Sequence, residues 1–384
     1  MNILYITPLL PDSLLKKVYE KDRSHYVFAP QKFHRNLVEG FQENGHSVRV
    51  LSVLPSVIDY VNSIEENSVY YSFIPFTDKP GIKHFQIAWG VKRIISQAGT
   101  FRPDVIVCDT LNTSMCIGAL WARRNCNAKF VGIVTDLPNS VSQFEKGLLN
   151  RASTYLSNKY IKSFDSYVLL TQQMNEVVNP KNKPYMIMEG VCDIPENDTH
   201  EVFQQSSMEK RKILYAGGRP SKDGIDMLLA AFRQIKGNDL ELNVYGTMPE
   251  VEIGPDPLDA RIIYHGKTEN SIIAKDELES YLLVNPRPTG EEYTKYSFPS
   301  KVMEYMATGT PMVTTKLAGI PEEYFKYVYT FDECTVDCYH SVLKKILSRR
   351  IDEHYQMGRE ARAFVLNHKN KKVQTERIIS LLNN

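Results

Sequence analysis

The stretch Tyr296–Val313 reads YSFPSKVMEYMATGTPMV and predicts a helix followed by a buried strand. Pro299 suits the start of the helix, because its missing backbone N–H would have no partner there. At about 100° per residue, Val302, Met303 and Met306 fall on one side of this helix. We therefore expect that side to pack against a sheet.

The opposite side of the same helix carries Ser300, Lys301 and Glu304. A lysine in the first turn lies at the positive end of the helix dipole, where a cation is mildly unfavourable. An anion bound by the free backbone N–H groups, Ser300 and Lys301 would explain this lysine. Glu304 lies about one turn, or roughly 5 Å, further along and could accept hydrogen bonds from sugar hydroxyls. Spacing alone leaves a second interpretation open, in which Lys301 and Glu304 form an ordinary surface ion pair.

Short apolar runs alternate with amphipathic stretches on both sides of this helix. Strands are predicted by the runs NILYIT, SVRVLSVL, PDVIVCD and AKFVGIVTD in the first half, and by ILYAGG, LELNVYG, RIIYHG and LLVNPRP in the second. Helices such as QKFHRNLVEGFQENGH and GIDMLLAAFRQI lie between them. Strand–helix–strand order implies parallel sheets. The predicted fold class is therefore α/β, with two Rossmann-like halves whose sheets face a central cleft.

A polar stretch with no apolar period, Asp193–Lys212, predicts a linker between these halves. The length of 384 residues also favours two domains. We expect an N-terminal domain at residues 1–195, completed by a C-terminal helix at 366–384, and a second domain at 196–365.

The composition argues against several classes of protein. A net charge of +1 gives no general attraction to nucleic acid, which is not expected as a partner. The six cysteines are scattered and form no CxxC pair of the kind found in zinc sites. No apolar run approaches the length of a membrane span, and the first residues show no signal-peptide pattern. We therefore predict a cytoplasmic protein, at most peripheral to the inner face of the plasma membrane.

The segment FPSKVMEYMATGTPMV, followed by LAGIPEE, resembles the donor-binding signature of family-four retaining glycosyltransferases with the GT-B fold. The resemblance is nearest to the branch found in bacterial capsule, exopolysaccharide and O-antigen clusters. In that family two glutamates stand eight positions apart around this helix. The second corresponds to Glu304, which implies a contact with the nucleotide ribose, whereas the first falls on Tyr296. Ser300 and Lys301 are then implied to bind the donor phosphates, and Lys301 to stabilise the leaving group.

The segment YAGGRPSKDGIDMLLAAF resembles a second signature of the family, in which an arginine and a lysine neutralise the donor diphosphate. Arg219 lies one position after the family's arginine, and Lys222 lies one position before its lysine. Gly217 and Gly218 would let the backbone approach phosphate closely. The one-residue shifts leave open whether Arg219 and Lys222 face phosphate or solvent.

Other candidates follow predicted strands. Asp136 lies where the family usually carries a His or a His-Asp pair near the transferred sugar, and Thr135 takes the His position. The Asp136 carboxylate could act in catalysis by orienting a sugar or acceptor hydroxyl, or it could cap the next turn. Asp109, which ends the preceding strand, is a second candidate. Arg287 could reach phosphate or base, or lie on the surface.

The resemblance implies a hexosyltransferase that retains the anomeric configuration and takes a nucleotide diphosphate sugar, with a UDP-sugar expected. The implied acceptor is a growing glycan on a polyprenyl carrier. No Asp-x-Asp motif is present, so no metal or other cofactor is expected. Two alternatives stay open: a nucleotide-sugar epimerase of the same fold, and a non-catalytic nucleotide-sugar-binding paralogue. The shifted Arg219 and Lys222 and the Tyr296 substitution motivate the latter.

Two segments of the first half suggest a membrane contact. One is the loop carrying Lys16, Lys17, Lys21 and Arg23, and the other is the aromatic-rich segment 68–85. They could face a lipid-linked acceptor at an anionic bilayer surface, or they could be ordinary surface loops.

Overall fold

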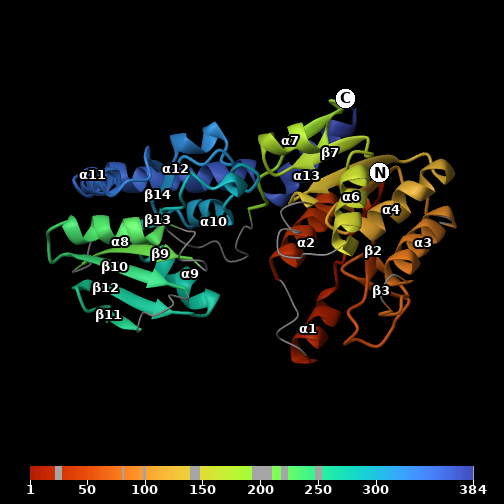
Figure 1. The fold of residues 1–384 in the computed structure, drawn as a ribbon, viewed down its shortest axis with the longest axis horizontal. Coiled ribbons are helices and arrows are strands. Elements are labelled where there is room, and N and C mark those ends of the chain that lie inside the picture. The colour runs from red at the N-terminus through yellow and green to blue at the C-terminus, as the bar shows by residue number, and fades with distance from the viewer. Residues whose placement is uncertain are drawn as a thin grey trace. The chain divides into compact units, whose positions relative to one another are not determined.

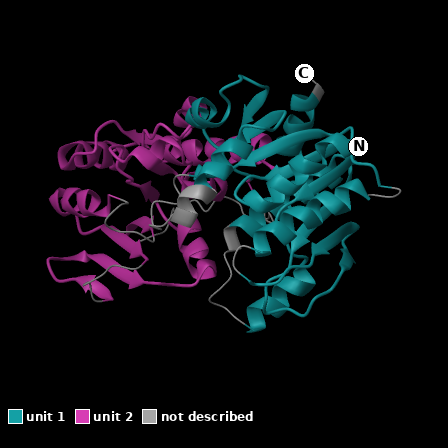
Figure 2. Ribbon diagram, turned by 45° about the vertical axis from the view of Figure 1, so that its right-hand side comes forward, with its two compact units in different colours: residues 1–191, 371–384 teal, residues 192–370 magenta. Residues whose placement is uncertain are grey.

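The structure is a computed structural model, and it describes residues 1–21, 28–79, 82–97, 101–138, 148–192, 210–217, 224–246 and 253–383. The chain forms two compact units, residues 1–191 with 371–384 and residues 192–370 (Figure 2). Sequence reasoning placed the boundaries at 195 and 365. Most of the predicted linker, residues 193–209, lies outside the described residues.

The first unit is built on an eight-stranded sheet in the order β3-β4-β2-β1-β5-β6-β7-β8, parallel except for the pair β3–β4 (Figure 1). Its strands are β1 (Asn2–Ile6), β2 (Ser47–Val53), β3 (Ser63–Glu66), β4 (Val69–Ile74), β5 (Val105–Asp109), β6 (Lys129–Val134), β7 (Ser166–Leu169) and β8 (Tyr185–Ile187). Its helices are α1 (Asp12–Lys21), α2 (Phe28–Glu43), α3 (Ile82–Ser96), α4 (Thr113–Ala122), η1 (Arg123–Asn125), α6 (Leu148–Ile161), α7 (Gln172–Val178) and α13 (Lys371–Asn383). The order of the strands reverses between β1 and β5, which is the position where open α/β sheets bind ligands.

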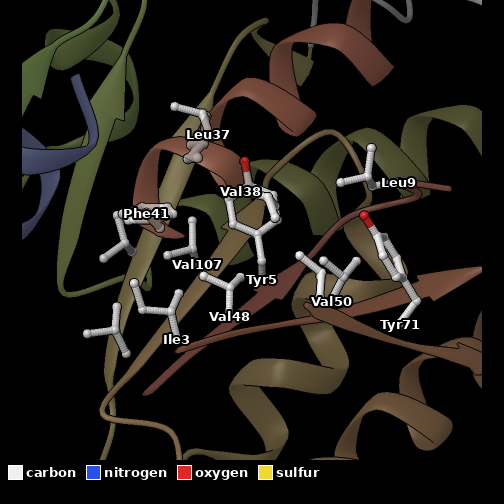
Figure 3. Packing of buried hydrophobic residues seen from close by; sticks show 14 of the residues in the cluster. Ile3, Tyr5, Leu9, Leu37, Val38, Phe41, Val48, Val50, Tyr71 and Val107 are labelled. Atoms are coloured by element: carbon white, nitrogen blue, oxygen red, sulfur yellow. The ribbon is translucent and has the colours of Figure 1, made fainter. Parts of the chain in front are cut away.

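The core of this unit joins the central strands to α2 and to the end of the chain. Figure 3 shows Ile3 and Tyr5 of β1 packed with Leu37 and Phe41 of α2. Residues two apart on a strand point to the same face, so Ile3 and Tyr5 share this side of the sheet. Helix α13 contributes Ile378 to the same cluster, which is why the last residues of the chain belong to the first unit.

The second unit is built on a seven-stranded sheet in the order β11-β12-β10-β9-β13-β14-β15, parallel except for the pair β11–β12. Its strands are β9 (Arg211–Ala216), β10 (Leu240–Tyr245), β11 (Gly254–Asp256), β12 (Asp259–Gly266), β13 (Leu282–Asn285), β14 (Met312–Thr315) and β15 (Tyr329–Phe331). Its helices are α8 (Ile225–Gln234), α9 (Asn270–Leu278), η3 (Glu292–Lys295), α10 (Ser300–Thr308), η4 (Glu322–Lys326), α11 (Val336–Leu347) and α12 (Ile351–His368). The order reverses between β9 and β13, so this sheet also has a switch point. The predicted α/β class with two Rossmann-like halves is confirmed.

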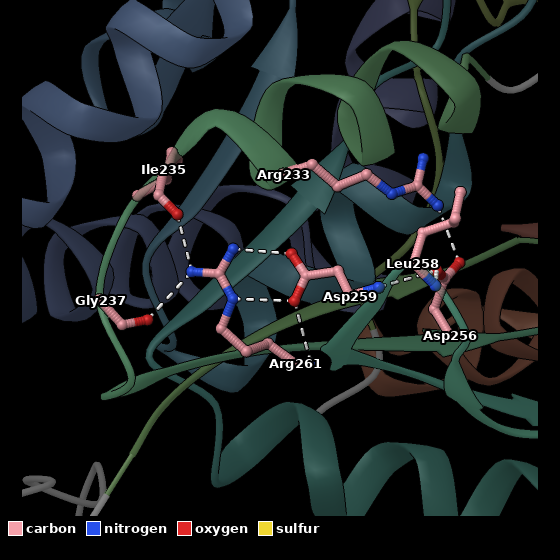
Figure 4. A network of polar contacts seen from close by, with 7 residues as sticks. All are labelled: Arg233, Ile235, Gly237, Asp256, Leu258, Asp259 and Arg261. Atoms are coloured by element: carbon pink, nitrogen blue, oxygen red, sulfur yellow. Dashed lines mark hydrogen bonds and ion pairs between the residues drawn. The ribbon is translucent and has the colours of Figure 1, made fainter.

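A network of charged side chains fixes the hairpin β11–β12 to the end of α8 (Figure 4). Arg261 binds Asp259 through two nitrogens and donates to carbonyl oxygens of the segment that follows α8. Arg233 pairs with Asp256 at 2.8 Å. These four charges satisfy one another near the start of β12, away from the carboxyl ends of the strands, so we assign them a structural role.

The described helices include none that is both long enough and apolar enough to cross a membrane.

Candidate functional site

Helix α10 presents the two sides that the sequence predicts. Val302, Met303 and Met306 are buried, whereas Ser300 and Glu304 are exposed. The helix begins at Ser300, so Pro299 stands immediately before the first helical residue rather than at it. Tyr305, which sequence reasoning did not single out, is buried as well.

Lys301 lies between two carboxylates. Its Nζ is 3.0 Å from Glu304 Oε2 and 3.3 Å from Oε1 of Glu277, a buried residue of α9. The interpretation of Lys301 and Glu304 as a surface ion pair therefore accounts for one contact of Lys301 but not for its contact with Glu277. Glu277 was not predicted, because nothing in the sequence indicates that α9 and α10 lie side by side.

This arrangement keeps the lysine charged. Burial disfavours the ammonium form of Lys301, but the attraction of Glu304 and Glu277 is stronger in sum and raises its pKa. Burial raises the pKa of Glu277 despite the neighbouring ammonium. A cation is thus held in the first turn of α10, where the helix dipole alone would disfavour it.

Tyr305 connects this cation to the end of β9. The backbone N–H of Ala216, the last residue of β9, donates to the Tyr305 hydroxyl at 3.2 Å. The ammonium of Lys301 lies 5.5 Å from the centre of the Tyr305 ring. Since Gly217 follows Ala216, the structure brings the predicted residues Gly217 and Lys301 to the same edge of the sheet.

Glycines follow or end three neighbouring strands at this edge: Gly217 after β9, Gly246 after β10 and Gly266 at the end of β12. The backbones approach so closely that a Cβ on Gly246 would lie 1.7 Å from the carbonyl oxygen of Gly217. Glycine is therefore required at this edge, where the N–H groups of Gly217 and Gly246 donate to the carbonyl oxygens of Tyr245 and Gly266 at 3.1 and 2.8 Å. Gly218, Arg219 and Lys222 lie outside the described residues.

The end of β13 meets the start of α8 at the switch point. The Pro286 carbonyl accepts a hydrogen bond from Tyr339 at 2.9 Å, and a Cβ on Gly224 would lie 2.2 Å from it. Gly224 has a φ of 72° and immediately precedes α8. Arg287 is the next residue after Pro286 and is half-buried. The structure thus places Arg287 at the switch point of the second sheet.

Two aspartates at the ends of neighbouring strands of the first unit differ in their surroundings. Asp109 ends β5, and Asp136 follows β6. Asp109 is buried and accepts hydrogen bonds from Thr7 at 3.2 Å and Asn112 at 2.7 Å. Its carboxylate also lies 3.3 Å from Nε2 of His34, and these contacts lower its pKa although burial opposes ionisation. Asp136 is exposed, and partial loss of hydration, together with repulsion from Asp109, raises its pKa. Of these two carboxylates, Asp109 is anchored by buried partners and Asp136 is the accessible one.

His34 extends this anchor, and sequence reasoning did not identify it. Its Nδ1 lies 2.7 Å from the Tyr5 hydroxyl, and both side chains are buried. His34 shares one side of α2 with Val38 and Phe41, at spacings of four and seven. A histidine on the apolar side of a helix was the signal that could have revealed it.

In the part of the chain that the structure describes, no three or more His, Cys, Asp or Glu side chains are arranged to hold a metal ion.

Comparison with protein families gives one match. Residues 210–333, which include β9, α8 and α10, match the family model described as Glycosyl transferases group 1. No curated protein matches the chain.

Solved structures match along the whole chain. Sucrose-phosphate synthase from Thermosynechococcus elongatus is 15% identical, with a TM-score of 0.64 over 100% of this chain and 98% of that chain. The lipopolysaccharide outer core galactosyltransferase WaaB in its apo form is 11% identical, with a TM-score of 0.63 over 100% and 99%. HepE from Anabaena in complex with UDP and glucose is 12% identical, with a TM-score of 0.57 over 100% and 99%. At these identities the likeness is one of fold.

Proposed function

We propose that this chain, which has the GT-B fold and whose residues 210–333 match the family model of glycosyltransferase group 1, transfers a hexose from a nucleotide diphosphate sugar to a growing glycan. A UDP-sugar is the proposed donor. The Anabaena structure of the same fold contains UDP and glucose, which supports this choice.

The observation that carries the proposal is the charged Lys301 at the start of α10, connected through Tyr305 to the end of β9. Nucleotides bind at the switch points of open α/β sheets, with phosphate at the N-terminus of a helix. Among the described residues, none accepts a hydrogen bond from the backbone N–H of Ser300 or Lys301. Two amides and an ammonium can therefore bind the donor diphosphate together.

The pair Lys301–Glu304 changes partners in this proposal. The exposed Glu304 turns to accept hydrogen bonds from the ribose hydroxyls, and Lys301 turns to the leaving phosphate. The buried Glu277 keeps the lysine at the start of the helix when Glu304 leaves it. In this proposal Gly217, directly after β9, lies beside the diphosphate, and Arg287 at the switch point supplies a further cation.

Stabilisation of the leaving diphosphate by an ammonium, a guanidinium and amides requires no metal ion. We therefore propose a metal-independent reaction. We also propose that the reaction retains the anomeric configuration, that Asp136 orients the sugar or the acceptor hydroxyl, and that the acceptor is a polyprenyl-linked glycan. These finer assignments follow from the family resemblance and from the accessible position of Asp136.

The experiment is a thermal-shift and calorimetric panel of nucleotide sugars, followed by turnover assays with and without a polyprenyl-linked glycan and with EDTA. The proposal predicts binding of UDP-sugars and acceptor-dependent release of UDP that EDTA does not abolish. Inversion at C2 of the sugar without acceptor would indicate an epimerase. Binding without turnover on any lipid-linked acceptor would indicate a non-catalytic protein.

A further inference from the structure

Helix α3 of the first unit has two apolar sides. Ile87, Val91 and their neighbours are buried against the rest of the unit. On the other side, Ile82, Phe85 and Trp89 expose 50%, 60% and 49% of their surfaces. At about 100° per residue, these three residues fall within roughly a 60° arc that faces away from the buried side. We name Ile82, Phe85 and Trp89 the outer stripe.

The buried side of α3 is closely fitted to its neighbours, so the outer stripe has no place in the core. A Cβ on Gly118 of α4 would lie 2.2 Å from the Ala88 carbonyl oxygen, and a Cβ on Gly90 would lie 2.5 Å from Ile74 of β4. These contacts fix which side of the helix faces outward. A row of three large apolar side chains on an outward face marks an interaction surface.

The charges on α3 are all positive. Between Ile82 and Ser96 the helix carries Lys83, Lys92 and Arg93 and has no acidic residue. The Arg93 guanidinium lies 5.6 Å from the centre of the Trp89 ring, beside the outer stripe. Lys83 is paired with Asp78 at 2.9 Å, so Lys92 and Arg93 are the cations of the helix that we expect to attract an anionic partner.

This combination selects the kind of partner. Helices that lie in a bilayer interface combine tryptophan, phenylalanine and aliphatic side chains with lysine and arginine. Long cationic side chains can bury their stems in the apolar layer while their charges reach anionic headgroups. A helix without acidic residues complements such a surface in charge along its whole length.

The outer stripe overlaps the aromatic-rich segment 68–85, because Ile82 and Phe85 belong to both. The first part of this segment forms strand β4, in which Val69, Tyr71 and Phe73 are buried. Of the four basic residues that the sequence placed in a loop, Lys16, Lys17 and Lys21 belong to helix α1, and Arg23 lies outside the described residues.

We propose that the outer stripe of α3, with Lys92 and Arg93, docks the first unit onto an anionic bilayer surface. This surface would bring the enzyme to a lipid-linked acceptor, and in that respect it rests on the proposed function. The docking itself needs neither donor nor acceptor, so its failure and the failure of the donor site are separate outcomes.

The chain contains only two tryptophans, which makes docking directly visible. In a Trp121→Phe variant, Trp89 is the sole tryptophan reporter. We expect its fluorescence to shift to shorter wavelength with phosphatidylcholine vesicles that contain phosphatidylglycerol. Phospholipids brominated on the acyl chains should quench it. Vesicles of phosphatidylcholine alone should give neither effect, and added salt should reverse the shift.

Vesicle sedimentation of variants separates the two contributions. Replacing Ile82, Phe85 and Trp89 together by glutamine should weaken partitioning at least tenfold. Replacing Lys92 and Arg93 by glutamine should weaken it roughly fivefold for each cation. The matched control replaces Ile253 and Leu258 by glutamine, because these apolar side chains of the second unit are 76% and 81% exposed. It should partition like the parent, and calorimetry should give all variants the UDP affinity of the parent.

Three results would overturn the proposal. One is a parent protein that does not bind vesicles containing phosphatidylglycerol. Another is a triple glutamine variant that partitions like the parent. The third is that size-exclusion chromatography shows the parent as an oligomer and the triple variant as a monomer, while both bind vesicles equally. That result would make the outer stripe a contact between copies of the chain.

Discussion

At the scale of single residues, the donor proposal depends on the two contacts of Lys301. The sequence predicted Ser300, Lys301 and Glu304 on one side of a helix, because helical periodicity is a local property. Glu277 could not be predicted, since its contact with Lys301 arises only when α9 and α10 pack together. The position of Arg219 and Lys222 relative to phosphate stays a prediction.

Loss of either partner in the pair Lys301–Glu304 should weaken nucleotide binding. We expect Lys301→Ala and Glu304→Ala each to reduce the UDP affinity by about 1.5–3 kcal/mol, because each removes a charged hydrogen bond. Isothermal titration calorimetry measures this loss. Lys275→Ala is the matched control, since Lys275 lies on α9, is 75% exposed and pairs with Glu279. If both site variants bind UDP like the parent, the assignment of α10 is wrong.

His354 should make the second unit sensitive to acid. It is fully buried, donates from Nε2 to the Tyr281 carbonyl at 2.8 Å, and accepts at Nδ1 from Tyr329 at 3.1 Å. Burial lowers its pKa from 6.5 to about 4. The folded state therefore favours the neutral ring, and its contribution is complete above pH 6.5 and is lost as the pH falls toward 4.

The lowering of the His354 pKa corresponds to about 3 kcal/mol of the free energy of unfolding, lost when the ring is protonated. Chemical denaturation across this pH range should show a steeper loss of stability for the parent than for His354→Gln. His340→Gln serves as the control and should keep the slope of the parent. Equal slopes for the parent and His354→Gln would contradict the assignment.

At the scale of elements, the predicted strands were found where continuous apolar runs end in polar residues, as in β5 and β6. The outer helices were harder to predict. Helix α3 has apolar side chains on both its buried and its outward sides, so its sequence lacks the single apolar stripe of an ordinary surface helix. Strand β9 begins within the last residues of the predicted linker, because Arg211 already pairs with Leu240 of β10 in the sheet and its side chain lies 2.6 Å from Asp239.

The glycines at the carboxyl ends of the strands should be individually required. Gly246→Ala combines a φ of 119° with a collision against the Gly217 carbonyl oxygen. We expect it to reduce the free energy of unfolding by more than about 2 kcal/mol. Gly254→Ala has a similar φ of 130° but open space around its Cβ, so it isolates the effect of backbone strain and should cost less. If denaturation curves give Gly246→Ala and Gly254→Ala the same loss of free energy of unfolding, the close approach of Gly246 to the Gly217 carbonyl oxygen is not important.

At the scale of the whole molecule, the first unit depends on the last residues of the chain. Residues 371–384 belong to it, and Lys371 pairs with Glu39 at 2.8 Å and with Glu43 at 3.0 Å. Sequence reasoning placed a completing helix at 366–384, whereas the helix of the first unit is α13, Lys371–Asn383. Local periodicity does not show which sheet a terminal helix covers.

A chain that ends at Asn370 should therefore lose stability in the first unit. It would lack the buried Ile378 and Leu382, each worth about 1.5–3 kcal/mol. Hydrogen exchange measured by mass spectrometry should show faster exchange in β1, β2 and β5, while β9, β10 and β13 keep the protection of the parent. A chain shortened only by Asn384 is the control. Equal loss of protection in both units would contradict this division of the chain.

The most direct test of the central claim is a crystal structure of the protein with UDP. The account predicts that the diphosphate lies within hydrogen-bond distance of the Ser300 and Lys301 amides and the Lys301 ammonium, with Glu304 on the ribose hydroxyls. A nucleotide bound at the carboxyl ends of the strands of the first sheet, or one that leaves Lys301 paired with Glu304, would contradict it.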